Sequence, residues 1–318
     1  MFDSTRRTAR WLAAATATLL LISCGGSSND TPAAPPLFSK VYVLGTSTSD
    51  NVGNGCAASP ADYCPPSPPY AAPRISNGPL FNELLAARYG ASMTAARLGG
   101  TNFAYSGART GPIAGTTQKV PNLVTQADQY LASVNYQSNP QYLYVIDAVA
   151  FGNDVSDALK LSATNPNAPA QIVAGGVTNV FGIITRLYAS GARHILVANS
   201  TDVGKTPLAR LAGAVAAAGA TQMSLQFNGA LAQQVAAIRA TSPGLNLYLL
   251  DVGAFTAEAQ ASPAAFGYTN VTDPCFNDLA PSLGVCATPN TYFYFDTFHG
   301  TATTNNWIYQ RAVKLLPI

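Results

Sequence analysis

The sequence predicts an α/β protein whose central sheet is mostly parallel. Short apolar runs alternate along the chain with longer segments in which apolar residues recur at helical spacing. The chain has 318 residues, of which 48% are hydrophobic and only 10% are charged, so it can bury a substantial core. No internal repeat or second-domain linker appears. We therefore expect residues 37–318 to form a single domain.

Four apolar runs of strand length predict the main strands of this sheet, and each is separated from the next by a segment with helical spacing. They lie at Lys40–Leu44, Tyr142–Ile146, His194–Ala198 and Leu245–Val252. A shorter strand is expected near Arg97.

The helices are predicted from apolar residues three or four positions apart. Pro79–Tyr89 shows the pattern with Phe81, Leu84, Leu85 and Tyr89, and Pro207–Ala240 is Ala-rich but interrupted by glycines, so it can form one helix or two. The other predicted helices are Leu123–Leu131, Ala170–Ala189 and Thr301–Leu316, the last of which would close the fold.

The N-terminal residues have the pattern of an export signal rather than of a folded element. Arg6, Arg7 and Arg10 precede an apolar stretch, Trp11–Ile22, that is too short to span a bilayer. The stretch ends in Leu-Ile-Ser-Cys24-Gly, which resembles the lipobox of bacterial lipoprotein signal peptides.

That resemblance implies a signal peptide over residues 1–23 and a lipid anchor at Cys24. An ordinary secretory signal with an incidental cysteine is the alternative. Residues 24–36 are rich in Gly, Ser and Pro and are expected to be a flexible tether. Both alternatives predict an exported protein, either an outer-membrane lipoprotein held to the membrane through Cys24 or a secreted or periplasmic protein.

The charge pattern argues against a nucleic-acid partner. The net charge of +2 comes from the first ten residues, and the remaining chain holds 14 basic and 14 acidic residues. No basic run with interleaved aromatic residues occurs, so the electrostatic footprint of a nucleic-acid-binding protein is missing from the sequence.

The four cysteines other than Cys24 fit an oxidising compartment. Proximity in the sequence favours disulfides between Cys56 and Cys64 and between Cys275 and Cys286, although the four cysteines can be paired in three ways. No cluster of His residues lies near them, so no metal site is expected. The pairs lie in two irregular, Pro- and Gly-containing segments, Asn51–Ser76 and Ser262–Asn290, which we expect to rim one cleft or to be stapled surface loops.

The sequence contains two histidines, and one of them, His299, lies three positions after an acid, Asp296. Far upstream, the first predicted strand runs into a small-residue turn that carries Ser47. A hydroxyl at the end of a strand and an Asp-x-x-His near the C-terminus suggest a Ser/His/Asp triad. The second histidine, His194, begins an apolar run and is expected to be structural.

Two further segments complete a pattern. Residues 99–110 are rich in small side chains, which would let the backbone approach a ligand closely. Asn153 follows the predicted strand Tyr142–Ile146, where its amide could donate to a developing negative charge. Together with Gly45-Thr46-Ser47 and Asp296-x-x-His299, these four blocks resemble the SGNH/GDSL hydrolases in content, order and approximate spacing. The resemblance covers the chain from about residue 40 onward.

The resemblance implies a three-layer α/β/α sandwich and a role for each block. Ser47 corresponds to the nucleophile, Asp296 and His299 to the acid and the base, and Gly107 and Asn153 to oxyanion donors beside the N–H of Ser47. It also implies an esterase or lipase that acts on a small-molecule or lipid ester, without metal or cofactor. A ligand-binding surface lipoprotein that keeps the fold without turnover is the alternative from another class. An acyltransferase, or an enzyme that cleaves polyesters or carbohydrate esters, is the alternative within the family.

The blocks depart from the family pattern at three positions. Thr46 stands where the family usually has Asp, Phe151 where it usually has Gly, and Gly300 where Pro commonly follows the histidine. The α/β-hydrolase fold is excluded because the sequence contains no G-x-S-x-G string. Tyr63, Tyr70 and Phe298 could line an acyl pocket or serve in packing.

Overall fold

The computed structural model of the protein describes residues 37–317. These residues lie within one compact unit that begins at Pro36. The predicted signal peptide and tether, and Cys24 with its predicted lipid modification, lie outside the described residues.

The described chain is built on a parallel four-stranded sheet in the order β1-β2-β3-β4. The strands are β1 (Val41–Leu44), β2 (Leu143–Asp147), β3 (His194–Ala198) and β4 (Asn246–Leu250). Side chains alternate between the faces of the sheet, as a pleated strand requires. In β1, for example, Leu44 joins the core on one face, whereas Val41 and Val43 join the core on the other. The predicted α/β class is confirmed.

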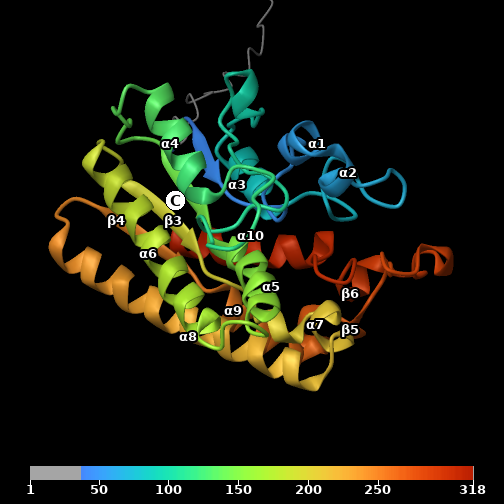
Figure 1. Ribbon diagram of the computed structural model, residues 1–318. Coiled ribbons are helices and arrows are strands. Elements are labelled where there is room, and N and C mark those ends of the chain that lie inside the picture. Colours follow the sequence, from blue (N-terminus) through green and yellow to red (C-terminus); the bar gives the residue numbers. More distant parts are fainter. Residues whose placement is uncertain (1–36, 318) are drawn as a thin grey trace, which may run out of the picture. The chain divides into compact units, whose positions relative to one another are not determined.

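Helices cover both faces of this sheet, which gives three layers (Figure 1). On one face the main core is formed with α4 (Leu123–Ser133), α5 (Phe151–Leu161), α6 (Ala168–Ala189) and α8 (Ala214–Thr241). On the other face α3 (Phe81–Arg88) and α10 (Ala302–Leu315) lie against the sheet, and they contact each other. Helix α6 is long and apolar enough to cross a membrane by composition, but it packs against α4, α5 and α8.

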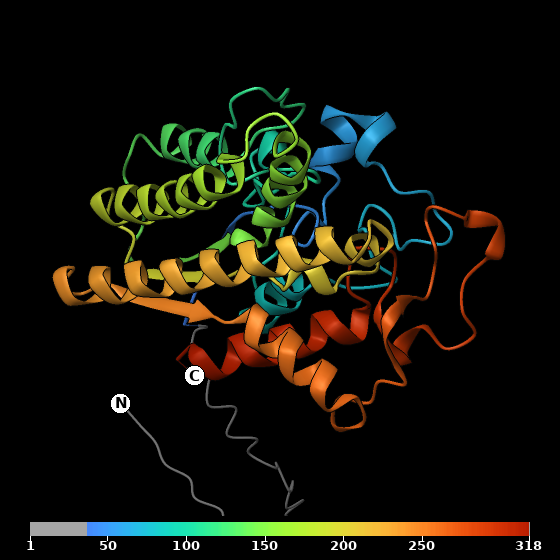
Figure 2. The ribbon, with the colours of Figure 1, turned by 60° about the horizontal axis from the view of Figure 1, so that its bottom comes forward.

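Smaller elements lie beyond the carboxyl ends of the strands (Figure 2). Helices α1 (Asn54–Ala58) and α2 (Pro60–Tyr63) follow β1, α7 (Pro207–Leu211) precedes α8, and α9 (Val252–Ala261) follows β4. A second, two-stranded parallel sheet pairs β5 (Asn270–Pro274) with β6 (Tyr292–Tyr294). The patterns in the sequence do not predict α1, α2, α5, α9, β5 or β6.

Two sequence predictions need correction. The expected strand near Arg97 is a 3-10 helix, Ala96–Leu98, which ends at Gly99 in the left-handed conformation. The predicted strand Leu245–Val252 ends at Leu250, because the Asp251 side chain accepts a hydrogen bond from the N–H of Ala254 and caps α9.

The segment Pro207–Ala240 forms two helices, α7 and α8. Thr206 caps α7 by accepting from the N–H of Ala209. The break falls at Gly213, whose φ of 99° few other residues adopt. Gly219 and Gly229 lie inside α8 without interrupting it.

Candidate active site

The structure brings Ser47, His299 and Asp296 together, although 252 positions separate the serine from the histidine. Ser47 lies in the turn that follows β1, at the carboxyl edge of the sheet. The Nε2 atom of His299 is 2.8 Å from the Oγ atom of Ser47. On the other side of the ring, Nδ1 is 2.8 Å from Oδ2 and 3.0 Å from Oδ1 of Asp296. This arrangement allows the imidazole to take the proton of the hydroxyl.

Asp296 is buried and accepts hydrogen bonds from several directions. The backbone N–H groups of Phe298 and His299 donate to Oδ1 at 2.8 and 2.6 Å. The hydroxyl of Tyr70 donates to Oδ2 at 2.9 Å. These donors hold the carboxylate in place, so that it can orient the imidazole ring.

The electrostatics of the Asp296–His299 pair favour its charged form. Burial on its own would raise the pKa of Asp296 and lower that of His299. The attraction between the two groups and the hydrogen bonds that they share outweigh burial, so the pKa of Asp296 is lowered and the pKa of His299 is raised. The carboxylate of Asp278 adds to the rise at His299. The site is therefore arranged to stabilise an imidazolium ion.

The turn that carries Ser47 is held from both sides. Gln126 on α4 accepts from the N–H of Gly45 and donates to its carbonyl, at 2.8 and 2.9 Å. On the other side, the hydroxyls of Thr48 and Ser49 both donate to Asp147 at the end of β2, at 2.5 and 2.7 Å. A side chain at Gly45 would lie only 2.8 Å from Ser49 and 3.0 Å from Asp147, so the turn requires glycine there.

Gly107, the expected backbone donor of the second block, adopts a conformation that favours glycine, with a φ of 81°. A Cβ atom at this position would lie 2.2 Å from the ring of Tyr63. The neighbouring Ser106 donates through its N–H and its hydroxyl to Asp50, which also accepts from the N–H groups that begin α1. Among residues 37–317, the N–H groups of Ser47 and Gly107 donate to no other residue, so both are free to bind an oxyanion.

Asn153 lies in the first turn of α5, and its amide points toward the same turn. Nδ2 donates to the carbonyl of Ala108 at 2.8 Å and to the hydroxyl of Thr46 at 3.1 Å. Thr46, which stands where the family usually has Asp, thus serves as an acceptor for Asn153. Donation from Asn153 to a reacting oxygen would replace the bond to Thr46.

The other two departures have local explanations. Phe151 is fully buried and stacks on Phe227 of α8, with ring centroids 4.0 Å apart, so it belongs to the core rather than to the site. Gly300 leaves room for Thr304, which would lie 2.7 Å from a Cβ at this position. His194 lies at the start of β3, at the opposite edge of the sheet from Ser47, and its ring packs edge-on against Phe38.

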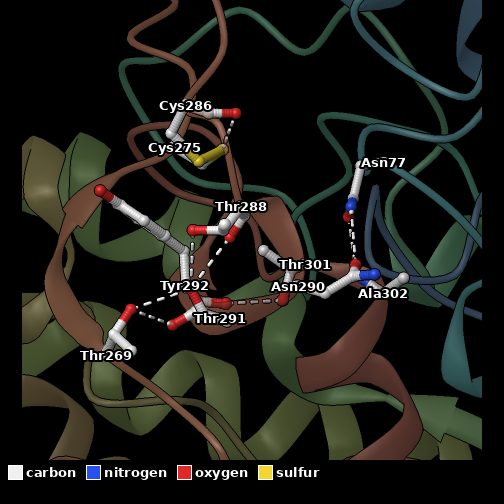
Figure 3. The surroundings of a disulfide bond; sticks show 10 residues. All are labelled: Asn77, Thr269, Cys275, Cys286, Thr288, Asn290, Thr291, Tyr292, Thr301 and Ala302. Atoms are coloured by element: carbon white, nitrogen blue, oxygen red, sulfur yellow. Dashed lines mark hydrogen bonds between the residues drawn. A yellow bond between two sulfur atoms is a disulfide. The ribbon is translucent and has the colours of Figure 1, made fainter.

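The two disulfide-bearing loops meet beside the triad. The structure contains the disulfides Cys56–Cys64 and Cys275–Cys286. Tyr70, from the first loop, packs edge-on against Phe276, from the second, at 5.6 Å. Figure 3 shows a second link, in which Asn77 donates to Asn290 and accepts from the N–H of Ala302 at the start of α10.

Sequence reasoning missed how three side chains serve the site. Tyr70 was expected to line a pocket or to pack, and it donates to Asp296. Asp147 directly follows the predicted strand Tyr142–Ile146, and a carboxylate at the end of a buried strand is a usable signal. Thr46 was noted only as a departure, and no pattern in the sequence identifies it as the acceptor for Asn153.

Comparisons with known proteins agree with this geometry. The family described as GDSL-like Lipase/Acylhydrolase matches residues 41–312. A protein of Aeromonas hydrophila named phosphatidylcholine-sterol acyltransferase is 26% identical over 247 residues, which are 76% of this chain and 66% of the relative. Lipase 1 of Photorhabdus luminescens is 28% identical over 172 residues, 54% of this chain and 23% of the relative. The match thus spans less than two thirds of each relative.

Proposed function

Because the chain belongs to the GDSL-like lipase/acylhydrolase family, we propose that it hydrolyses carboxylic esters through an acyl-enzyme intermediate on Ser47. The observation that carries this proposal is the 2.8 Å contact between His299 and Ser47, with Asp296 held on the far side of the ring. The names of the two relatives, a lipase and an acyltransferase, agree with ester chemistry.

The proposed mechanism has two halves. His299 removes the proton of Ser47 as its Oγ attacks the ester carbonyl, and the resulting imidazolium protonates the departing alcohol. A water molecule, deprotonated by the same imidazole, then attacks the acyl-serine and releases the acid. Asp296 holds the ring in the required tautomer and stabilises its charged form throughout.

The negative charge on the carbonyl oxygen would be stabilised by three donors. The free N–H groups of Ser47 and Gly107 are two of them, and the amide of Asn153 is the third once it leaves Thr46. A preorganised donor of this kind contributes on the order of 10²–10³ in rate.

A panel of p-nitrophenyl esters from acetate to palmitate tests this function. The wild-type protein is expected to release p-nitrophenol, and Ser47→Ala is expected to lose that activity. The position of the chain-length optimum separates an esterase from a lipase. Equal rates for wild type and Ser47→Ala would contradict the proposal.

Acyl transfer to an alcohol is a second candidate, which the name of the Aeromonas relative favours. Both reactions share the acyl-serine and differ in whether water or an alcohol attacks it. Measuring ester against acid product with added alcohol acceptors separates them.

We further propose that residues 1–23 are a signal peptide, that residues 24–36 tether the protein, and that residues 37–318 are one hydrolase domain. The two disulfides favour an exported protein. The lipobox-like sequence supports a lipid anchor at Cys24. Metabolic labelling with palmitate that is lost in Cys24→Ala would support the anchor, and a secreted, unlabelled wild-type protein would refute it.

A further inference from the structure

A cavity of about 50 Å³ borders His299 of the candidate triad. Its lining includes His299 and Thr48, the residue after Ser47. One wall is formed by residues that follow successive strands, Val149 after β2, Thr201 after β3 and Val252 after β4. The cavity thus follows the carboxyl edge of the parallel sheet, which is where ligands of such sheets bind.

The opposite wall of this sheet-edge cavity comes from the helical layer of α3 and α10. Leu80 and Phe81 lie at the start of α3 and are almost fully buried. Ile308 of α10 is half-buried and closes the wall beside them. Figure 2 shows the two helices side by side. The cavity therefore lies between the edge of the sheet and this helical layer, with His299 in its lining.

The polar groups around the cavity already have partners. The hydroxyl of Thr48 donates to Asp147, and the hydroxyls of Thr201 and Thr256 bond to each other at 2.9 Å. Thr304 donates to the carbonyl of Phe293 at 2.6 Å. Among the described residues, the lining consequently presents mainly Val, Leu, Ile and Phe side chains with satisfied hydroxyls between them, which suits an alkyl chain better than a polar group.

We propose that the sheet-edge cavity binds the acyl chain of the ester and restricts it to short chains. The inference rests on the proposed ester hydrolysis. A water molecule needs about 10–15 Å³ by the same measure, so 50 Å³ accommodates a chain of about two to four carbons. The acyl chain stays on Ser47 after the alcohol has left, so a mainly apolar cavity lined by His299 and Thr48 suits the acyl half of the substrate.

The test compares acetate, butyrate, hexanoate and octanoate esters of p-nitrophenol on the full-length protein and two variants. Wild type is expected to prefer acetate or butyrate. Ile308→Ala widens the cavity and is expected to raise the hexanoate-to-acetate ratio of kcat/KM by about 10-fold or more, since one methylene in an apolar pocket changes selectivity about 10- to 200-fold. Ile113→Ala, a half-buried isoleucine in the other core, is the control and should leave the ratio unchanged.

A second measurement needs no variant. The affinity of wild type for n-alkylboronic acids, which form adducts with a reactive serine, is expected to peak at about two to four carbons. Affinity that rises steadily to octyl would overturn the inference, as would equal ratios for Ile308→Ala and Ile113→Ala.

Two outcomes separate this inference from the function on which it rests. If Ile308→Ala alters selectivity among acetyl esters of different alcohols but not among acyl chains, the cavity holds the alcohol, and the inference fails while ester hydrolysis stands. If wild type hydrolyses no ester and binds no boronic acid, the proposed function fails and the inference falls with it.

Discussion

At the scale of single residues, His299 gains its proposed role from its surroundings rather than from its identity. Its ring lies between Ser47 and Asp296, and the pair with the buried carboxylate raises its pKa. His194 has the opposite environment. Its pKa is lowered by burial, and it packs on an aromatic ring at the far edge of the sheet.

Replacing each histidine by alanine should therefore have very different effects. His299→Ala removes the proposed general base and is expected to lower kcat by about 10⁴-fold or more. His194→Ala is expected to leave kcat within about 3-fold, because it touches none of the reacting groups. Steady-state kinetics on a short-chain ester measures both, and losses of equal size would contradict the assignment of the base.

The raised pKa of His299 determines the pH profile. The ring must be neutral to accept the proton of Ser47, so kcat/KM should fall on the acid side through a pKa above about 6.5, the ordinary value for histidine. Tyr70→Phe removes one donor from Asp296, which then attracts the imidazolium more strongly. The acid limb should move to higher pH, with a loss in kcat of about 3- to 10-fold.

The pH profile of Tyr70→Phe separates a positioning role from a purely structural one. A tyrosine that only packs against Phe276 and Phe295 keeps those contacts as phenylalanine. In that case the acid limb of kcat/KM would stay where it is in wild type, and the interpretation of Tyr70 as a positioning residue would fail.

At the scale of elements, α5 is joined to the segment that carries Gly107 by a buried carboxyl group. Asp154, in the first turn of α5, accepts from the N–H and the hydroxyl of Thr110. Burial raises its pKa to about 7, although the hydrogen bonds from Thr110 and the charge of Arg109 act in the opposite direction. Because no full counter-charge offsets the burial of Asp154, its contribution to the stability of the fold depends on pH.

The free energy of unfolding should consequently fall as the pH rises from about 4 to about 7. Below about pH 4 Asp154 is protonated in both states, whereas between about pH 4 and 7 it is ionised only in the unfolded chain, which favours unfolding. Asp154→Asn abolishes this dependence. Its free energy of unfolding relative to wild type should rise from pH 4 to pH 8 by up to about 4 kcal/mol.

Urea denaturation at the two pH values measures the effect of Asp154→Asn. The control is Asp128→Asn, which removes an exposed ion pair with Arg186 and should change stability by less than about 1 kcal/mol at either pH. A pH-independent difference between Asp154→Asn and wild type would show that the carboxyl does not titrate in this range.

The disulfides act on loops rather than on the sheet. Each closes a short loop, with separations of 8 and 11 residues, at the rim of the site. Reduction should accelerate amide hydrogen exchange in residues 51–76 and 262–290, while the amides of β1 to β4 keep their protection. Uniform acceleration throughout the sheet would contradict this division, and four free thiols in the protein as isolated would contradict the disulfides themselves.

At the scale of the whole molecule, hydrophobic periodicity was sufficient for the sheet and for most of the helices that cover it. His194–Ala198 was predicted with both ends correct, because a fully buried strand is a continuous apolar run. Helix α5 was missed because only a short 3-10 helix, Ala148–Ala150, separates it from β2, so no loop marks its start in the sequence. Arg97 was misassigned because the backbone of Gly99 ends a short helix there.

The candidate site could likewise be predicted only in part from the sequence. Ser47, His299 and Asp296 could be predicted because sequence motifs and the scarcity of histidine point to them. The partners that hold them could not, because Tyr70 reaches Asp296 across 226 positions and Gln126 reaches Gly45 across 81. Such contacts depend on how loops pack, and no local pattern records them.

The most direct test of the account is covalent labelling of the full-length protein with a fluorophosphonate probe, followed by mass spectrometry of its peptides. We expect one adduct, on Ser47, that forms in wild type, is absent in Ser47→Ala and is greatly slowed in His299→Ala. A well-folded wild-type protein that stays unlabelled, or an adduct on another serine, would contradict the proposed nucleophile and favour a protein that binds ligands without turnover.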